Sequence, residues 1–171
     1  MTQKKVRRKQ SSASKKPVIT LKKILVPIDF SGHSRSALQY AISFARQFRA
    51  RIDLLYVVEP TIYPADFSFG QVGFPNIEEE LRKRAANELE SLMRNDIAGR
   101  VPATKTIRSG RPFYEINQYA KEQRIDIIII ATHGHSGMEQ ILFGSTAEKV
   151  VRGAPCPVLV VRSGEKGFVR S

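Results

Sequence analysis

The chain has 171 residues, 42% of them hydrophobic and 26% charged, so we expect one domain of about 150 residues with short extensions. No apolar run approaches the roughly 20 residues that span a bilayer, which argues against a membrane protein. The single cysteine, Cys156, excludes an internal disulfide and predicts a reducing compartment, the cytoplasm.

The formal net charge of +12 is uneven, because seven lysines and arginines and no acid lie in residues 1–20. This segment is rich in Ser and Gln and poor in aromatic residues, so we predict a disordered basic tail. We expect a solvated extension, and contact with nucleic acid or another polyanion is the alternative. Residues 164–171 are predicted to form a second short tail, which leaves a folded domain over 21–163.

The first predicted elements are a short buried strand over 23–28 and a helix that follows it. Ser31 is a suitable N-cap, and alanines and phenylalanines then recur at helical spacing as far as Phe48. A second apolar run predicts a buried strand over 51–58. Residues 61–75 contain prolines, glycines and four aromatic residues, so we predict a loop that packs against another surface.

The second half of the chain continues to alternate helices and strands. Apolar residues at helical spacing over 81–93 predict a long amphipathic helix. The weaker hydrophobicity of residues 103–108 predicts a strand near a sheet edge, and Pro112 is well placed in the first turn of the next helix. The remaining predicted elements are a strand over 126–131, a helix over 144–152 and a strand over 157–162. This alternation predicts an α/β fold, a five-stranded parallel sheet with helices on both faces, and leaves the strand order open.

The most informative motif follows the strand over 126–131. Ala131-Thr132-His133-Gly134 is separated by nine residues from Gly144-Ser145-Thr146, which opens a helix. Glycines allow the backbone to approach a ligand closely, and the free N–H groups and dipole of a helix N-terminus attract phosphate. The hydroxyl groups of Ser145 and Thr146 add donors. We therefore interpret this motif as a phosphate-binding loop.

The motif resembles the signature of the nucleotide-binding branch of the universal stress protein family, which is Gly, two residues, Gly, nine residues, Gly, then Ser or Thr. Gly134 and Gly144 match its second and third glycines, and Ala131 stands at the first. Segments 24–31 and 156–161 extend the resemblance over most of the chain. The resemblance implies a stress-response function and the strand order 3-2-1-4-5. It also implies a homodimer through the last strand, at Val158, Leu159, Val160 and Val161.

In that strand order, the carboxyl ends of the first and fourth strands meet at a topological switch point, where ligands bind. The resemblance implies ATP there, with the phosphates at the glycine-rich motif and the base and sugar beside the first two strands. Asp29 can accept from a ribose hydroxyl or help to hold a hydrated Mg²⁺, and Val57 can form an apolar wall for adenine. The expected binding residues are Pro27, Asp29, Val57, Ile130, Ala131, Gly134, Gly144, Ser145 and Thr146.

Ala131 leaves two alternatives open. If its position needs a positive φ, alanine costs about 1 kcal/mol or more relative to glycine, and its methyl group obstructs the ligand. If the residue is extended at the end of a strand, alanine costs little. The sequence does not distinguish these two conformations.

Other functional motifs are missing from the sequence. There is no P-loop and no dinucleotide-binding fingerprint, and Gly134-His135-Ser136-Gly137-Met138 lacks the final glycine of a nucleophile elbow. For His33, His133 and His135 we expect polar or phosphate contacts rather than a zinc site.

We interpret the chain as a nucleotide-binding regulatory protein that acts by binding rather than by fast turnover. One alternative is a protein of the same fold that has no bound nucleotide and acts through its surfaces. Others are a slow nucleotide hydrolase, and an enzyme with His133 or Asp29 as its acid–base group.

Overall fold

The computed structural model describes residues 19–59, 75–132 and 144–162. Its strands are β1 (Lys23–Pro27), β2 (Arg51–Val58), β3 (Ala103–Ser109), β4 (Ile127–Ala131) and β5 (Val158–Val161). Its helices are α1 (Gly32–Phe48), α2 (Pro75–Leu92), which continues into the π-helical turn η2 (Met93–Ile97), then α3 (Pro112–Gln123) and α4 (Ser145–Gly153). The predicted elements are therefore present. Their ends lie within two residues of the predicted ends, except that α2 begins at Pro75, before the predicted run over 81–93.

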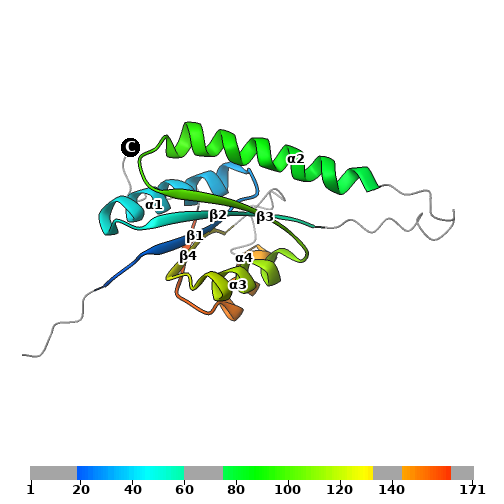
Figure 1. Ribbon diagram of the computed structural model, residues 1–171. Coiled ribbons are helices and arrows are strands. Elements are labelled where there is room, and N and C mark those ends of the chain that lie inside the picture. The colour runs from blue at the N-terminus through cyan, green and yellow to red at the C-terminus, as the bar shows by residue number, and fades with distance from the viewer. Residues whose placement is uncertain (1–18, 60–74, 133–143, 163–171) are drawn as a thin grey trace, which may run out of the picture.

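The five strands form one parallel sheet in the order β3-β2-β1-β4-β5, which confirms the predicted fold class and strand order. Helices α1 and α2 cover one face of the sheet, and α3 and α4 cover the other (Figure 1). β3 lies at one edge, as its weak hydrophobicity predicted, and β5 lies at the other. No helix in the described segments is both long enough and apolar enough to cross a membrane.

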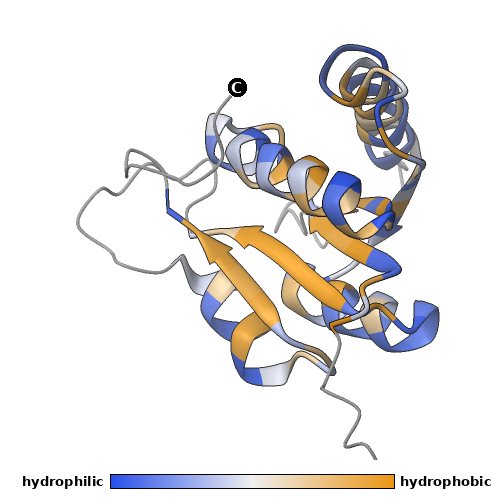
Figure 2. Cartoon of the chain, turned by 90° about the vertical axis from the view of Figure 1, so that its left-hand side faces the viewer, coloured by the Kyte–Doolittle hydropathy of each residue, from blue (hydrophilic) through white to orange (hydrophobic). Residues whose placement is uncertain are grey.

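Alternate residues of each strand point to opposite faces, so the sheet separates two hydrophobic clusters. In β1, Ile24 and Val26 pack under α1 and α2, whereas Leu25 packs under α3 and α4. All three side chains are fully buried. Apart from the edge strand β3, the strands are mainly hydrophobic for this reason (Figure 2), as expected of a parallel sheet covered on both faces.

The turns at the two ends of α1 have clear local causes. The Ser31 hydroxyl accepts a hydrogen bond from the Ser34 amide at 3.1 Å, which confirms the predicted N-cap. At the other end Arg49 adopts a left-handed conformation, with φ of 54°, and its amide donates to the Ala45 carbonyl. This geometry ends the helix and directs the chain into β2.

One buried charge interrupts the apolar pattern of β2. Asp53 is fully buried, and its carboxylate accepts a 2.9 Å hydrogen bond from the Thr104 hydroxyl of β3. The Arg51 guanidinium approaches both carboxylate oxygens at 3.1 Å. Because a buried carboxylate needs such partners, this network fixes the pairing of β2 with β3 beneath α3.

Replacing Asp53 with alanine should lower the free energy of unfolding by about 2 kcal/mol, because Arg51 and Thr104, which both stay accessible to water, lose hydrogen bonds to a charged acceptor. Urea denaturation followed by circular dichroism measures this change. Glu79→Ala is the matched control, since the exposed Glu79–Lys83 pair contributes at most about 0.5 kcal/mol. An Asp53→Ala protein with the wild-type unfolding midpoint would contradict this account of the network.

Candidate functional site

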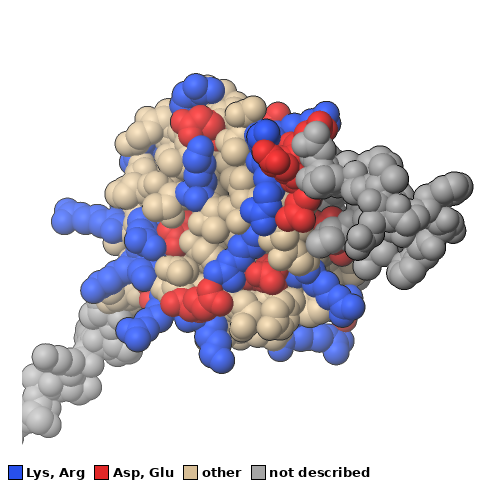
Figure 3. Space-filling view, turned by 45° about the vertical axis from the view of Figure 1, so that its right-hand side comes forward, with Lys and Arg blue, Asp and Glu red and all other residues tan. Residues whose placement is uncertain are grey.

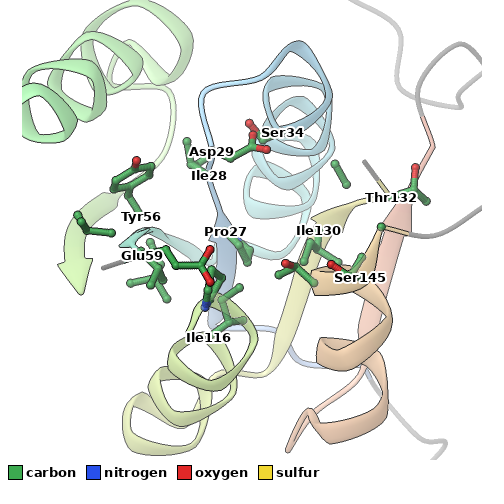
Figure 4. A pocket seen from close by; sticks show the side chains of 18 of the residues that line it. Pro27, Ile28, Asp29, Ser34, Tyr56, Glu59, Ile116, Ile130, Thr132 and Ser145 are labelled. Atoms are coloured by element: carbon green, nitrogen blue, oxygen red, sulfur yellow. The ribbon is translucent and has the colours of Figure 1, made fainter. Parts of the chain in front are cut away.

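A cavity of about 490 Å³ opens where β1, β2 and β4 end, beside the first turns of α3 and α4 (Figure 4). Eight of the nine expected binding residues line it: Pro27, Asp29, Val57, Ile130, Ala131, Gly144, Ser145 and Thr146. The ninth, Gly134, lies outside the described residues, as do His133 and His135. The structure thus brings together residues from four separate parts of the chain at the predicted switch point.

The N-terminus of α4 provides the positive end of the cavity. Gly144 is its N-cap, and it has no side chain that could accept a hydrogen bond from the first-turn amides. The Gly144 amide donates to the Thr132 carbonyl at 2.7 Å, and the Thr132 amide donates to the Val161 carbonyl at 3.0 Å. These bonds hold the start of α4 against the end of β4. The amides of Ser145 and Thr146 are therefore positioned for an anionic ligand.

Asp29 supplies a carboxylate from the end of β1. Its Oδ1 accepts from the Ser31 amide at 3.0 Å and from the Ser31 hydroxyl at 2.6 Å. Its Oδ2 accepts no hydrogen bond from the residues that the structure describes, so this oxygen is available to a ligand. A carboxylate oxygen in this position suits a ribose hydroxyl or a hydrated Mg²⁺.

The residue after Asp29 has an unusual conformation for an aromatic side chain. Phe30 has a φ of 64°, in the left-handed region, and its ring stacks on Tyr56 of β2 with centroids 4.8 Å apart. A bulky residue at positive φ costs about 1 kcal/mol or more, and strain of this kind is concentrated at functional sites. The stack of Phe30 on Tyr56 helps to hold the turn that carries Asp29.

The remainder of the cavity is mainly apolar. Val57 and Ile130 come from the sheet, and Pro112 and Ile116 come from α3. These side chains form a wall of the type that a planar base requires. Glu59, which directly follows β2, adds a second carboxylate to the lining.

Sequence reasoning missed Tyr56, Glu59 and Leu81 as lining residues. Glu59 could have been predicted from the sequence, because it is the first polar residue after β2, just as Asp29 follows β1. Leu81 was assigned to the apolar face of α2, but it is 37% exposed and lines the cavity instead. Its position depends on how α2 is placed over the sheet, for which the sequence gives no signal.

A polar cluster fixes α2 beside the cavity. The Arg82 guanidinium donates to the Ser109 hydroxyl at 2.7 Å and to Glu78 at 3.1 Å, and Ser109 donates to Glu78 at 2.6 Å. The hydrogen bonds from Ser109 and Arg82 lower the pKa of Glu78. The cluster joins α2 to the carboxyl end of β3.

The structure shows the backbone conformation of Ala131, which the sequence left open. Ala131 lies in β4 in register with Val161, and it is not among the residues with positive φ. Its backbone is extended, so alanine carries no conformational strain there. The methyl group, 8% exposed, lies at the cavity wall and packs with the cluster under α1 and α2.

In the described segments, no group of three or more His, Cys, Asp or Glu residues is arranged to hold a metal ion. The fold is that of an α/β domain, and the polar groups of its cavity suit a phosphorylated ligand.

Comparison with known proteins places this domain in a family. Residues 20–162 match the Universal stress protein family, and the chain belongs to it. Universal stress protein MJ0531 of Methanocaldococcus jannaschii is 34% identical over 148 residues, which cover 85% of this chain and 84% of that protein. The solved structure of universal stress protein UspA from Lactobacillus plantarum superposes with a TM-score of 0.73 at 29% identity. This match covers 85% of this chain and all of that one.

Two more distant structures of the same fold contain nucleotides. A universal stress protein in complex with cAMP is 21% identical, with a TM-score of 0.61. A universal stress protein from Archaeoglobus fulgidus in complex with dAMP is 20% identical, with a TM-score of 0.56. At this identity, the likeness concerns the fold alone.

Because Ala131 is extended, Ala131→Gly should destabilise the protein by about 0.5–1 kcal/mol, the usual cost of glycine within a strand. Thermal unfolding by calorimetry measures the change. Ala103→Gly in β3 is the control and should behave similarly, since Ala103 is likewise an alanine within a strand, although it is only partly buried. An Ala131→Gly protein that melts at a higher temperature would show that alanine is strained at this position.

Proposed function

We propose that the chain binds ATP in the cavity between β1 and β4 and acts as a regulatory stress-response protein through binding rather than fast turnover. One observation carries this proposal: the uncapped N-terminus of α4 lies across the cavity from the Asp29 carboxylate. Such an arrangement offers hydrogen-bond donors to phosphates and an acceptor to a ribose. With its single cysteine, the protein is expected to work in the cytoplasm.

The phosphate groups are assigned to the start of α4. The amides and hydroxyls of Ser145 and Thr146 donate to phosphate oxygens, and Gly144 lets the backbone approach them. Gly134 is assigned to the phosphate-binding residues as well, because of its place in the sequence motif. The cAMP and dAMP complexes of distant relatives support the view that this fold accommodates an adenine nucleotide.

The base and sugar are assigned to the opposite end of the cavity. Val57, Pro112 and Ile116 contact the adenine ring, and Asp29 accepts from the ribose or helps to hold Mg²⁺ through water. The metal would balance phosphate charge near the two carboxylates, Asp29 and Glu59. A volume of about 490 Å³ lies within the range of small-molecule sites.

Isothermal titration with ATP and Mg²⁺ tests this proposal, after mass spectrometry has shown that no nucleotide co-purifies. We expect micromolar binding, and we expect Ser145→Asp to weaken it at least about tenfold, because its carboxylate occupies the place of a phosphate. An acidic residue in the first turn stabilises α4, so the loss would not reflect unfolding.

Ser43→Asp is the matched control, since it adds the same charge on α1 outside the residues that line the cavity. It should leave ATP binding unchanged. Protein free of nucleotide that gives no heat with ATP would contradict the proposal and favour a family member that acts through its surfaces. ATP turnover well above a buffer control would favour a hydrolase.

We propose further that the chain forms a homodimer through the exposed edge of β5. Val158, Leu159 and Val160 are only half-buried in the isolated chain, and β5 is the outermost strand. The carbonyls of Pro157 and Val161 accept from β4, so strand alternation turns the Val160 amide towards the open edge. An apolar strand with unpaired backbone groups favours pairing with a second copy.

Val160→Pro should convert the dimer into a monomer, because proline removes an outward N–H donor while remaining acceptable in an edge strand. Size-exclusion chromatography with light scattering measures the mass, and circular dichroism confirms the fold. Val160→Thr keeps the amide and the branched shape, so it should remain dimeric. A folded Val160→Pro protein that is still a dimer would rule out this interface.

A further inference from the structure

A row of basic residues lies at the edge of the sheet opposite the cavity, where the strands begin. In the spatial order β3, β2, β1 and β4, each strand is preceded by one cation, and these are Arg100, Arg49, Lys22 and Arg124. We call these four residues the amino-edge row. Neighbouring strands lie about 4.8 Å apart, so the row extends over roughly 15 Å.

Hydrogen bonds between the turns hold the row in place. The Arg51 amide donates to the Lys22 carbonyl at 2.9 Å, which ties the turn after α1 to the start of β1. The Lys23 ammonium donates to the Gln123 carbonyl at 2.7 Å, which ties the end of α3 to the same strand. The row is therefore carried by the rigid edge of the sheet.

These cations are not neutralised by nearby acids. Within the described segments, the side chains of Lys22, Arg49 and Arg124 form no ion pair. Arg100 donates only to backbone carbonyls, those of Asp96 and Ile97. Lys and Arg side chains project from this side of the molecule, the left-hand margin of Figure 3.

The carboxylates at this edge form hydrogen bonds or ion pairs with groups other than the side chains of the row. Asp126 Oδ2 accepts from the backbone amides of Lys22 and Lys23 at 2.7 and 2.9 Å. Asp53 is buried with Arg51, and Asp96 lies 3.7 Å from Arg35. Asp126 keeps its negative charge beside Lys22, and the row of four cations retains a net positive charge.

Two of the arginines stand where glycine would fit better. Arg49 and Arg124 are the C-cap residues of α1 and α3, with φ of 54° and 52°. Helices favour glycine in this left-handed position, and their dipole favours cations near the last turn. The dipole explains a basic residue in the last turn but does not require arginine at the strained position itself. At both positions the arginine is exposed at this edge of the sheet.

We infer that the amino-edge row binds the phosphodiester backbone of double-stranded nucleic acid without sequence preference. Arginine guanidinium groups bind phosphate oxygens in a bidentate manner, and a linear row of them suits one strand of backbone phosphates.

Among the described residues, Phe48 lies beside Arg49 at this edge, but its ring is partly buried against Phe44 and the cluster under α1 and α2, which favours a duplex over a single strand. Single-stranded nucleic acids are bound largely by stacking of bases on aromatic rings. Among the described residues, the large exposed hydrophobic side chains are Ile19, Leu81, Tyr114 and Val151. The only aromatic one, Tyr114, lies in the first turn of α3, at the cavity end of the sheet. Ile19 alone provides little apolar area for insertion into a membrane.

Fluorescence anisotropy of the full chain with a labelled 30-base-pair DNA duplex, at 50 mM salt and above, tests this inference. We expect micromolar affinity that falls steeply with salt and is equal for two unrelated sequences. The double variant R49G/R124G should bind on the order of tenfold more weakly, and the slope of log K against log salt should become shallower by about 2. Its melting temperature should not fall, because glycine suits both left-handed positions.

Two matched variants separate the row from net charge. K83Q/R84Q removes the same charge from the exposed surface of α2 and should keep the wild-type salt slope. R49K/R124K retains both charges but not the bidentate donors, so it should keep the wild-type salt slope and bind with an affinity between those of wild type and R49G/R124G. The inference is overturned if wild-type protein does not bind the duplex at 50 mM salt, or if R49G/R124G binds as K83Q/R84Q does. Binding to phosphatidylserine vesicles but not to duplex would instead identify a membrane surface as the partner.

Discussion

The strand order is the constraint on which the candidate site depends. Because β1 and β4 are neighbours, their carboxyl ends lie side by side. The chain then leaves β1 for α1 on one face and reaches α4 on the other face after β4 (Figure 1). None of the described helices therefore covers the space between the two strand ends. Asp29 and Gly144, which are far apart in sequence, lie on opposite sides of this space and form no hydrogen bond with each other.

The direction of the helices gives the two edges of the sheet opposite electrostatic character. In a parallel α/β fold every helix runs antiparallel to the strands, so helix N-termini gather at the carboxyl edge and helix C-termini gather at the amino edge. The first edge attracts the anionic part of a ligand, as at Ser145, and the second stabilises cations such as Arg49. The nucleotide proposal and the nucleic-acid inference thus concern opposite edges of one sheet, and each can be correct without the other.

The elements of the fold were predictable because apolar periodicity and local signals agree. Ser31 and Pro112 mark helix starts by their own chemistry, and each lies where it was expected. The buried charge of Asp53 was not predicted, because it stands within an apolar run and its partner Thr104 lies on a distant strand. The positive φ of Phe30 was not predicted either. Its stacking on Tyr56 and the turn around it stabilise that conformation, and neither can be read from the sequence.

The most direct test of the central claim is a crystal structure of the full chain grown with ATP and Mg²⁺. The account predicts phosphate oxygens within hydrogen-bond distance of the Ser145 and Thr146 amides, and the ribose or the hydrated metal beside Asp29. Crystals grown at saturating ATP that show this cavity filled by protein side chains, or the nucleotide at another surface, would contradict it.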